Sequence, residues 1–255
     1  LISERQRMEE LEYLFKHALA QEVAYESILQ QRRKQLHLKV ADSIEKIFEK
    51  RIHEFYGMLS YHYSKGENLN KAEKYLMKAG EEALRSSASS EAFNFYREGL
   101  RLYLNKYGAA ADQGKIADFE KNIALASFNK GQWENALRYI DNVLNRWGFG
   151  SSKNRTIIFI KAMYNLLVVI LNLYFPPKIK KKFPTPRDNA IFDLSYKKAI
   201  SLVELDPKKC FFEYISTLKR LTQFDIPKVQ NGVCMWMSAS GLFSWTGTSF
   251  ALSRK

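Results

Sequence analysis

The chain has 255 residues, of which 46% are hydrophobic and 26% charged, enough apolar side chains for a sizeable core. Its two cysteines, Cys210 and Cys234, exclude a disulfide framework, and a reducing compartment is the simpler expectation. The formal net charge is +13.

That positive charge is partly local, because residues 153–187 contain eight Lys or Arg and no Asp or Glu. Elsewhere acidic and basic residues are interspersed, as on solvated helix faces. No zinc-finger spacing, RNP-type aromatic motif or Gly-rich clamp accompanies the charge. We therefore expect no specific nucleic-acid partner.

The chain begins with Leu1 and shows neither a signal-peptide n-region nor a small-residue cleavage site. We expect a cytoplasmic fragment of a larger protein, with an N-terminal partner domain outside it, instead of a secreted protein.

Residues 1–51 predict a helical segment. Residues 13–17 could form a short strand or the end of a helix, and helical apolar patterns follow at 18–29 and 36–48. His17 and His37 lie beside apolar positions. No Cys or carboxylate spacing suggests a metal site, so packed or helix-capping histidines are favoured.

Residues 52–150 predict a block of about five helices, because short turns join antiparallel neighbours. One small-large-small spacing recurs in three of these helices. It occurs at Ala72/Leu76/Ala79, Ala92/Tyr96/Gly99 and Ala136/Ile140/Val143. The clearest unit is the hairpin of residues 115–147, with a turn at 129–132. A hairpin that cannot bury its own apolar face is typical of stacked helical arrays.

Residues 151–187 predict an apolar helix and a basic linker that contains prolines. Residues 157–175 carry one charge, Lys161, so length alone permits a membrane span. Lys161, Asn165 and Asn172 share a narrow arc, however, and this arc favours a helix buried in the array. A helix lying on a membrane surface and a spanning helix are the alternatives.

Residues 188–255 predict a second helical block. Apolar patterns indicate helices that end before Pro207 and near Pro227, and the uncharged segment 232–252 could be a third. The chain then stops in what looks like the middle of this block.

No motif for catalysis is present. Residues 241–249 resemble a phosphate loop, but their glycines are one residue too far apart and Thr248 stands in place of the lysine. Cys210 and Cys234 lack activating neighbours, so we expect buried structural cysteines. Glu81 and Glu82 are expected on a solvated helix face. We therefore expect no catalytic, cofactor-binding or metal-binding residues and no bound cofactor.

Several segments resemble one family. The string FKHALAQEVAYESIL at 15–29 resembles the segment that closes the ATPase module of large bacterial signalling proteins. These proteins join a class III adenylate/guanylate cyclase or kinase domain to a STAND/AAA-like ATPase and a tetratricopeptide-like tail. The resemblance includes Arg32-Arg33, Leu36-His37, Tyr61-His62-Tyr63, the Ala72 helix, Ala79-Gly80-Glu81, Asn231-Gly232 and the 241–247 segment.

This resemblance and the helical patterns together predict an all-α, tetratricopeptide-like hairpin array, an α-solenoid. The leading functional hypothesis is a non-catalytic region that binds a protein or effector and controls an attached ATPase or cyclase domain. The alternatives are a fragment of a cyclase enzyme whose catalytic domain lies upstream, and a scaffold that contacts a membrane surface through residues 157–182. The sequence does not settle which residues bind a partner. Asn122, Asn129, Arg138 and Asn142 are candidates, but ordinary solvent-exposed positions explain them as well. The oligomeric state is not predicted.

Overall fold

The computed structural model describes residues 2–7, 10–15, 17–150, 154–175 and 181–245. One antiparallel hairpin joins β1 (Ile2–Arg7) to β2 (Glu10–Phe15). The other regular elements are helical, which confirms the all-α class in this coarse form. The α-helices are α1 (Ala18–Ser27), α2 (Gln30–Ile47), α3 (Tyr56–Lys65), α4 (Leu69–Arg85), α5 (Ser89–Tyr107), α6 (Gln113–Asn129), α7 (Trp133–Arg146), α8 (Arg155–Tyr174), α9 (Pro186–Leu205), α10 (Pro207–Leu221) and α11 (Gly232–Trp245). Three 3-10 turns join them, η1 (Glu49–Phe55), η2 (Gly108–Ala110) and η3 (Ile226–Lys228).

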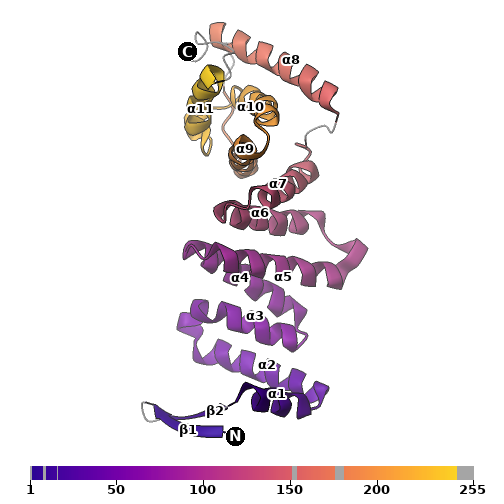
Figure 1. Ribbon diagram of the computed structural model, residues 1–255, viewed down its shortest axis with the longest axis vertical. Coiled ribbons are helices and arrows are strands. Elements are labelled where there is room, and N and C mark those ends of the chain that lie inside the picture. Colours follow the sequence, from indigo (N-terminus) through magenta and orange to yellow (C-terminus); the bar gives the residue numbers. More distant parts are fainter. Residues whose placement is uncertain (1, 8–9, 16, 151–153, 176–180, 246–255) are drawn as a thin grey trace.

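The helices from α2 to α7 each pack against the next one along the chain. Figure 1 shows them as successive layers along the longest axis, with the strands at one end and α8 to α11 at the other. Three buried apolar clusters follow one another along the molecule, shared by α2, α3 and α4, by α4, α5 and α6, and by α6, α7 and α9. The core is therefore a series of clusters along the molecule.

Small residues set the spacing between these layers. A Cβ added at Gly80 would lie 2.6 Å from the Tyr96 ring, and one added at Gly99 would lie 2.7 Å from the Phe119 ring. The aromatic rings of one helix thus fill the positions where the preceding helix lacks a side chain. The recurring small-large-small spacing predicted from the sequence falls on these buried faces.

Helix α2, within the first 51 residues, is continuous with the layers that follow. Ala41 and Ile44 of α2 share a buried cluster with Leu59 and Tyr63 of α3. The strand expected near the N-terminus corresponds to β2, which ends at Phe15. Residue 17 stands immediately before α1.

The order of packing changes after α7. The next helix to pack on α7 is α9, and α8 instead packs on α10. Ile140 and Val143 of α7 share a cluster with Ile191 and Leu194 of α9, across the expected boundary between blocks. In Figure 1 α8 lies across the far end of the molecule. Helix α8 is thus set outside the sequence of layers.

The expectation that α8 is a buried helix is wrong. Residues Thr156–Tyr174 form one helix that is long and apolar enough to cross a membrane by length and composition alone. Only 22% of this stretch is buried in the protein. Two residues of the polar arc point inward, because Asn165 and Asn172 donate to Ser216 and Thr222, whereas Lys161 is exposed. Among the described helices, α8 makes its main contact with α10, on one side, and the apolar side chains on its other side face outward.

Candidate functional site

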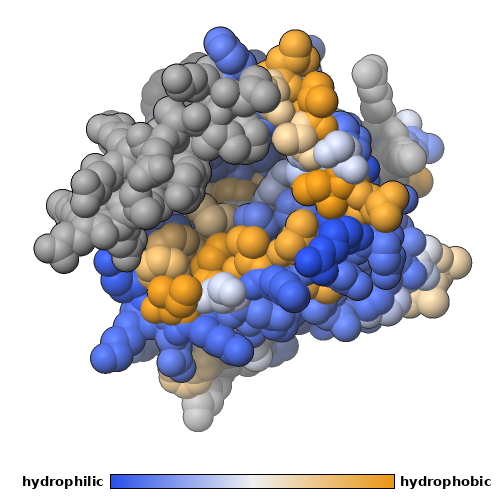
Figure 2. All heavy atoms as spheres, turned by 90° about the horizontal axis from the view of Figure 1, so that it is seen from below, coloured by the Kyte–Doolittle hydropathy of each residue, from blue (hydrophilic) through white to orange (hydrophobic). Residues whose placement is uncertain are grey.

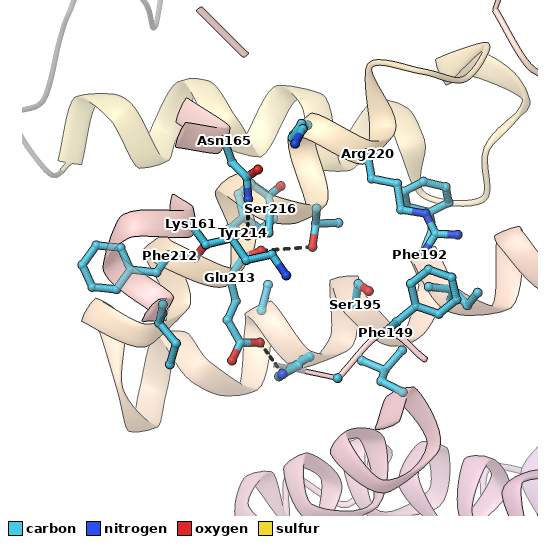
Figure 3. Close-up of a pocket in the computed structure, with 18 of the residues that line it drawn as sticks. Phe149, Lys161, Asn165, Phe192, Ser195, Phe212, Glu213, Tyr214, Ser216 and Arg220 are labelled. Carbon is cyan, nitrogen blue, oxygen red and sulfur yellow. Dashed lines mark hydrogen bonds and ion pairs between the residues drawn. The ribbon is translucent and has the colours of Figure 1, made fainter. Parts of the chain in front are cut away.

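Helices α7 to α10 surround a cavity of about 350 Å³. Figure 3 shows side chains from α8, α9 and α10 converging on it, with Phe149 contributed by the loop after α7. The volume falls within the usual range of sites for small molecules, about 300–1,000 Å³. The cavity exists because α8 is held away from α9 by its packing on α10.

A buried lysine forms one wall. Lys198 of α9 is 4% exposed, and it makes ion pairs with Asp141 of α7, at 2.7 Å, and with Glu213 of α10. Lys209 lies 3.8 Å from the second oxygen of Glu213. A buried cation requires such partners because its desolvation is costly. Lys198 therefore ties three helices together at the base of the cavity.

Helix α8 supplies the opposite wall. Asn165 is 3% exposed and donates to the Ser216 hydroxyl at 2.9 Å. The Ser216 and Thr217 hydroxyls bond in turn to backbone carbonyls one turn earlier in α10. Ser195 of α9 also lines the cavity. The lining thus combines hydroxyl and amide groups with apolar side chains.

Arg220 lies at another edge of the cavity. Its guanidinium is 3.9 Å from the centroid of the Phe149 ring and 5.3 Å from that of Phe192, and it pairs with Asp188 at 2.9 Å. Burial lowers the pKa of Arg220, although Asp188 opposes this shift. Burial alone would raise the pKa of Asp188, but hydrogen bonds from Thr185 and the charge of Arg220 outweigh it and lower that pKa.

The charge balance of the lining favours an anionic ligand. Four cationic side chains and one carboxylate line the described cavity. Lys198 and Arg220 already form ion pairs, and the Lys219 ammonium lies 4.3 Å from the centroid of the Tyr164 ring, so Lys161 is the lining cation best placed to face a bound group. Aromatic and hydroxyl groups beside them would orient a small molecule. The lining is therefore suited to binding a small anionic molecule.

A second, more apolar cavity of about 320 Å³ lies between α9, α10 and α11. Cys210 and Tyr214 line it. Burial and the nearby carboxylates of Glu213 and Asp206 raise the pKa of Cys210 to about 11, so its thiol is protonated at neutral pH. The expected burial is confirmed for Cys210.

The same expectation is wrong for Cys234, which is exposed. Helix α11 turns Met235, Ala239 and Phe243 toward the core, and Cys234 lies just before this face. In a helix of small, uncharged residues the sequence pattern locates the buried face only to within about one residue, so it could not separate Cys234 from its buried neighbours.

The candidate binding residues of the hairpin do not gather at the cavity. Asn129 and Arg138 are exposed, and Asn122 is half-buried. Asn142 donates to Glu120 of the neighbouring helix at 3.0 Å, so it has a packing role. The described lining includes none of these four.

Sequence reasoning missed two buried charged residues. Glu120 is 5% exposed and accepts from Arg146 at 2.9 Å, which ties α6 to α7. Lys198 is the other. It stands four residues after Leu194 and four before Leu202, so the helical period already placed it on the core face.

A polar cluster links α2 to α4 near the other end. Lys71 bonds to Glu45 at 2.7 Å and to Asp42 at 3.3 Å, and Tyr75 also donates to Glu45. Burial would raise the pKa of Glu45, but hydrogen bonds from Lys71 and Tyr75 outweigh it and lower the pKa. Tyr63 packs inside the cluster and donates to Asp42. Its groups satisfy one another, which is a structural role.

His37 and His62 form a further cluster with Tyr25. The two Nδ1 atoms are 2.9 Å apart, and Nε2 of His37 is 3.0 Å from the Tyr25 hydroxyl. His37 is therefore packed, while His17 is exposed and makes no side-chain cap for α1. Among the described residues, no group of three or more His, Cys, Asp or Glu could hold a metal ion.

Comparison of the chain with family models, curated proteins and solved structures finds no significant match in any of the three.

Proposed function

We propose that this chain is a non-catalytic helical-repeat region, tetratricopeptide-like in architecture, which controls an attached ATPase or nucleotide cyclase domain. The proposal combines the family resemblance of the first hundred residues with the layered helices and their recurring small-residue contacts. Such arrays act mainly by presenting surfaces to other molecules.

The observation that carries the proposal is an apolar face at the strand end of the molecule. On α1 and α2 the exposed large hydrophobic residues are Leu19, Val23, Leu36, Val40 and Ile47, and Leu29 lies between the two helices. The most exposed, Leu29, has 81% of its surface accessible. Figure 2 views the molecule from this end and shows hydrophobic residues gathered on a hollowed face. The terminal unit of a helical array normally carries a polar outer face, so this face is suited to covering by another domain.

In this proposal the attached domain packs on the α1–α2 face, and the cavity at the far end accepts an effector. The layers between them connect the two sites. A ligand can change the activity of the attached domain only if it binds its two states with different affinity.

The test uses the protein encoded by the whole gene. Leu19→Asp combined with Val23→Asp places charges on the face, and we expect it to release the attached domain and change its nucleotide turnover at least about threefold. Val203→Asp, at a 49% exposed position on α9, is the matched control. Unchanged turnover in the α1 variant, or in a deletion of residues 52–255, would contradict the proposal. So would a gene that encodes no phosphate loop or cyclase acids upstream.

A further inference from the structure

We infer that the outward face of α8 lies on an anionic membrane surface, with the helix parallel to the membrane plane. This inference goes beyond the proposed regulation of an attached domain, and its apolar residues are not part of the described cavity lining. It combines an outward apolar face, inward polar groups and a surrounding set of cations.

The outward face is continuous along the helix. Its residues recur every three or four positions, so they form one stripe. They are Ile157, Ile160, Tyr164, Leu167, Leu171 and Tyr174, each between 45% and 63% exposed. Phe159, Met163 and Phe175 widen the stripe. An apolar surface of this extent has no structural use while it faces water.

The inward face fixes the orientation of the helix. Asn165 and Asn172 donate to Ser216 and Thr222 of the α10 segment, at 2.9 and 3.2 Å. Leu166 and Val169 belong to the core cluster of the second block. These contacts hold one side of α8 against the protein. The opposite side, which carries the stripe from Ile157 to Tyr174, therefore projects outward, and we call it the ridge.

Cations surround this ridge. Lys219 lies 4.3 Å from the centroid of the exposed Tyr164 ring, and Lys161 is exposed on α8 itself. Lys181 donates to the backbone carbonyl of Thr222, the residue whose hydroxyl accepts from Asn172. Lys181 is thereby placed beside the last turns of α8.

No acidic residue occurs between positions 153 and 187, whereas eight basic residues do. Lys182, in the segment before α9, is exposed. An apolar face with these lysines near its border complements a surface with acyl chains below and anionic headgroups above. A spanning helix would instead have to withdraw Asn165 and Asn172 from their partners into lipid.

A second copy of the chain fits the face less well. The stripe has the three-and-four spacing of a coiled-coil seam. Its flanking positions are Lys161, Met163, Val168 and Ile170, only one of which is charged. Coiled-coil pairs normally place charges there to set register and partner. A broad apolar face without such charges favours lipid.

The experiment is flotation of the full chain with vesicles of phosphatidylcholine and phosphatidylserine, and with vesicles of phosphatidylcholine alone. We expect flotation with the anionic vesicles at low salt and release at high salt. Ile160→Gln combined with Leu167→Gln should weaken binding at least about tenfold. Lys161→Gln combined with Lys182→Gln should weaken it about fivefold or more.

Matched variants at the other end of the molecule serve as controls. Leu19→Gln with Val23→Gln removes equally exposed apolar side chains, and Lys46→Gln with Lys50→Gln removes exposed cations. Both should float like the parent. Circular dichroism checks that each variant is folded. A blue shift of the fluorescence of Tyr164→Trp on anionic vesicles provides a second measurement on an intact face.

Four results would overturn the inference. The folded chain could stay in the soluble fraction at low salt, or float equally with neutral vesicles. Resistance to carbonate extraction would indicate a spanning helix. Sedimentation as a dimer, abolished by the Ile160/Leu167 variant and accompanied by no flotation, would assign the face to a second copy of the chain.

Discussion

Replacing Lys198 with Met tests whether the buried ion pairs hold the second block together. The side chain is 6% exposed, and its partners Asp141 and Glu213 are 36% and 13% exposed. Removing one partner of a buried pair costs about 3–5 kcal/mol. Asp141 can be rehydrated, and Glu213 keeps Lys209 at 3.8 Å. We therefore expect the free energy of unfolding to fall by about 2–4 kcal/mol, somewhat less than the full cost of breaking a buried pair.

Urea unfolding followed by circular dichroism measures this loss as a lower midpoint. Lys208→Met, at an exposed position on the next helix, is the control and should stay within about 0.5 kcal/mol of the parent. Adding Glu213→Gln to Lys198→Met should recover part of the loss, since it removes the charge left without its main partner. A Lys198→Met variant as stable as the control would refute the assigned role of Lys198.

Two further predictions concern the first block. Burial lowers the pKa of His37, with contributions from His62 and Lys65, and burial also lowers the pKa of His62. The unfolded chain then binds more protons, so stability is complete above the ordinary histidine pKa of about 6.5 and falls as the pH drops below it. The urea midpoint should therefore decrease as the pH drops through this range, and His62→Gln should make the decrease smaller. A midpoint that does not change with pH would contradict the burial of the two histidines. Separately, Gly80→Ala would place a methyl 2.6 Å from the buried Tyr96 ring. It should lower stability by about 1–2 kcal/mol, because the clash outweighs the helix propensity gained. Gly241→Ala, in a helix with open space around the added Cβ, should not lower stability.

The positions of the helices could be predicted because each carries its own period. Ala72, Leu76 and Ala79 recur at helical spacing, and all three are buried. The turn at 129–132 follows from Gly131, which adopts a positive φ of 70° between α6 and α7. Local sequence suffices for such features, since the contacts that stabilise them are those of a helix with its immediate neighbours.

The orientation of α8 could not be predicted in this way. Its composition indicates burial, but burial depends on how many neighbours cover a helix. Here α9 packs against α7, and among the described helices α8 has its main contact with α10. The polar arc at Asn165 and Asn172 is visible in the sequence, but the partners that it faces lie 51 and 50 residues away, so local sequence does not specify its direction.

The cavity could not be predicted from the sequence either, because its walls come from four helices. Lys198 and Asp141 are far apart in sequence, and nothing in either helix alone specifies their contact. A lysine on the core face between Leu194 and Leu202 was nevertheless a usable signal. A buried lysine needs an anionic partner, so its position implied a carboxylate on the facing helix.

The displacement of α8 gives the cavity and the apolar ridge a common origin. Because α9 takes the place beside α7, α8 lies outside the layers, with a cavity under one side and solvent on the other. Asn165 lines the cavity and fixes the face that bears the ridge. A ligand that shifts α8 on α10 would therefore alter the presentation of the ridge, and membrane contact would alter the affinity for that ligand by the same factor. If the proposals for both sites hold, effector binding and membrane binding are thermodynamically coupled, and Asn165→Leu is the variant expected to weaken that coupling most directly.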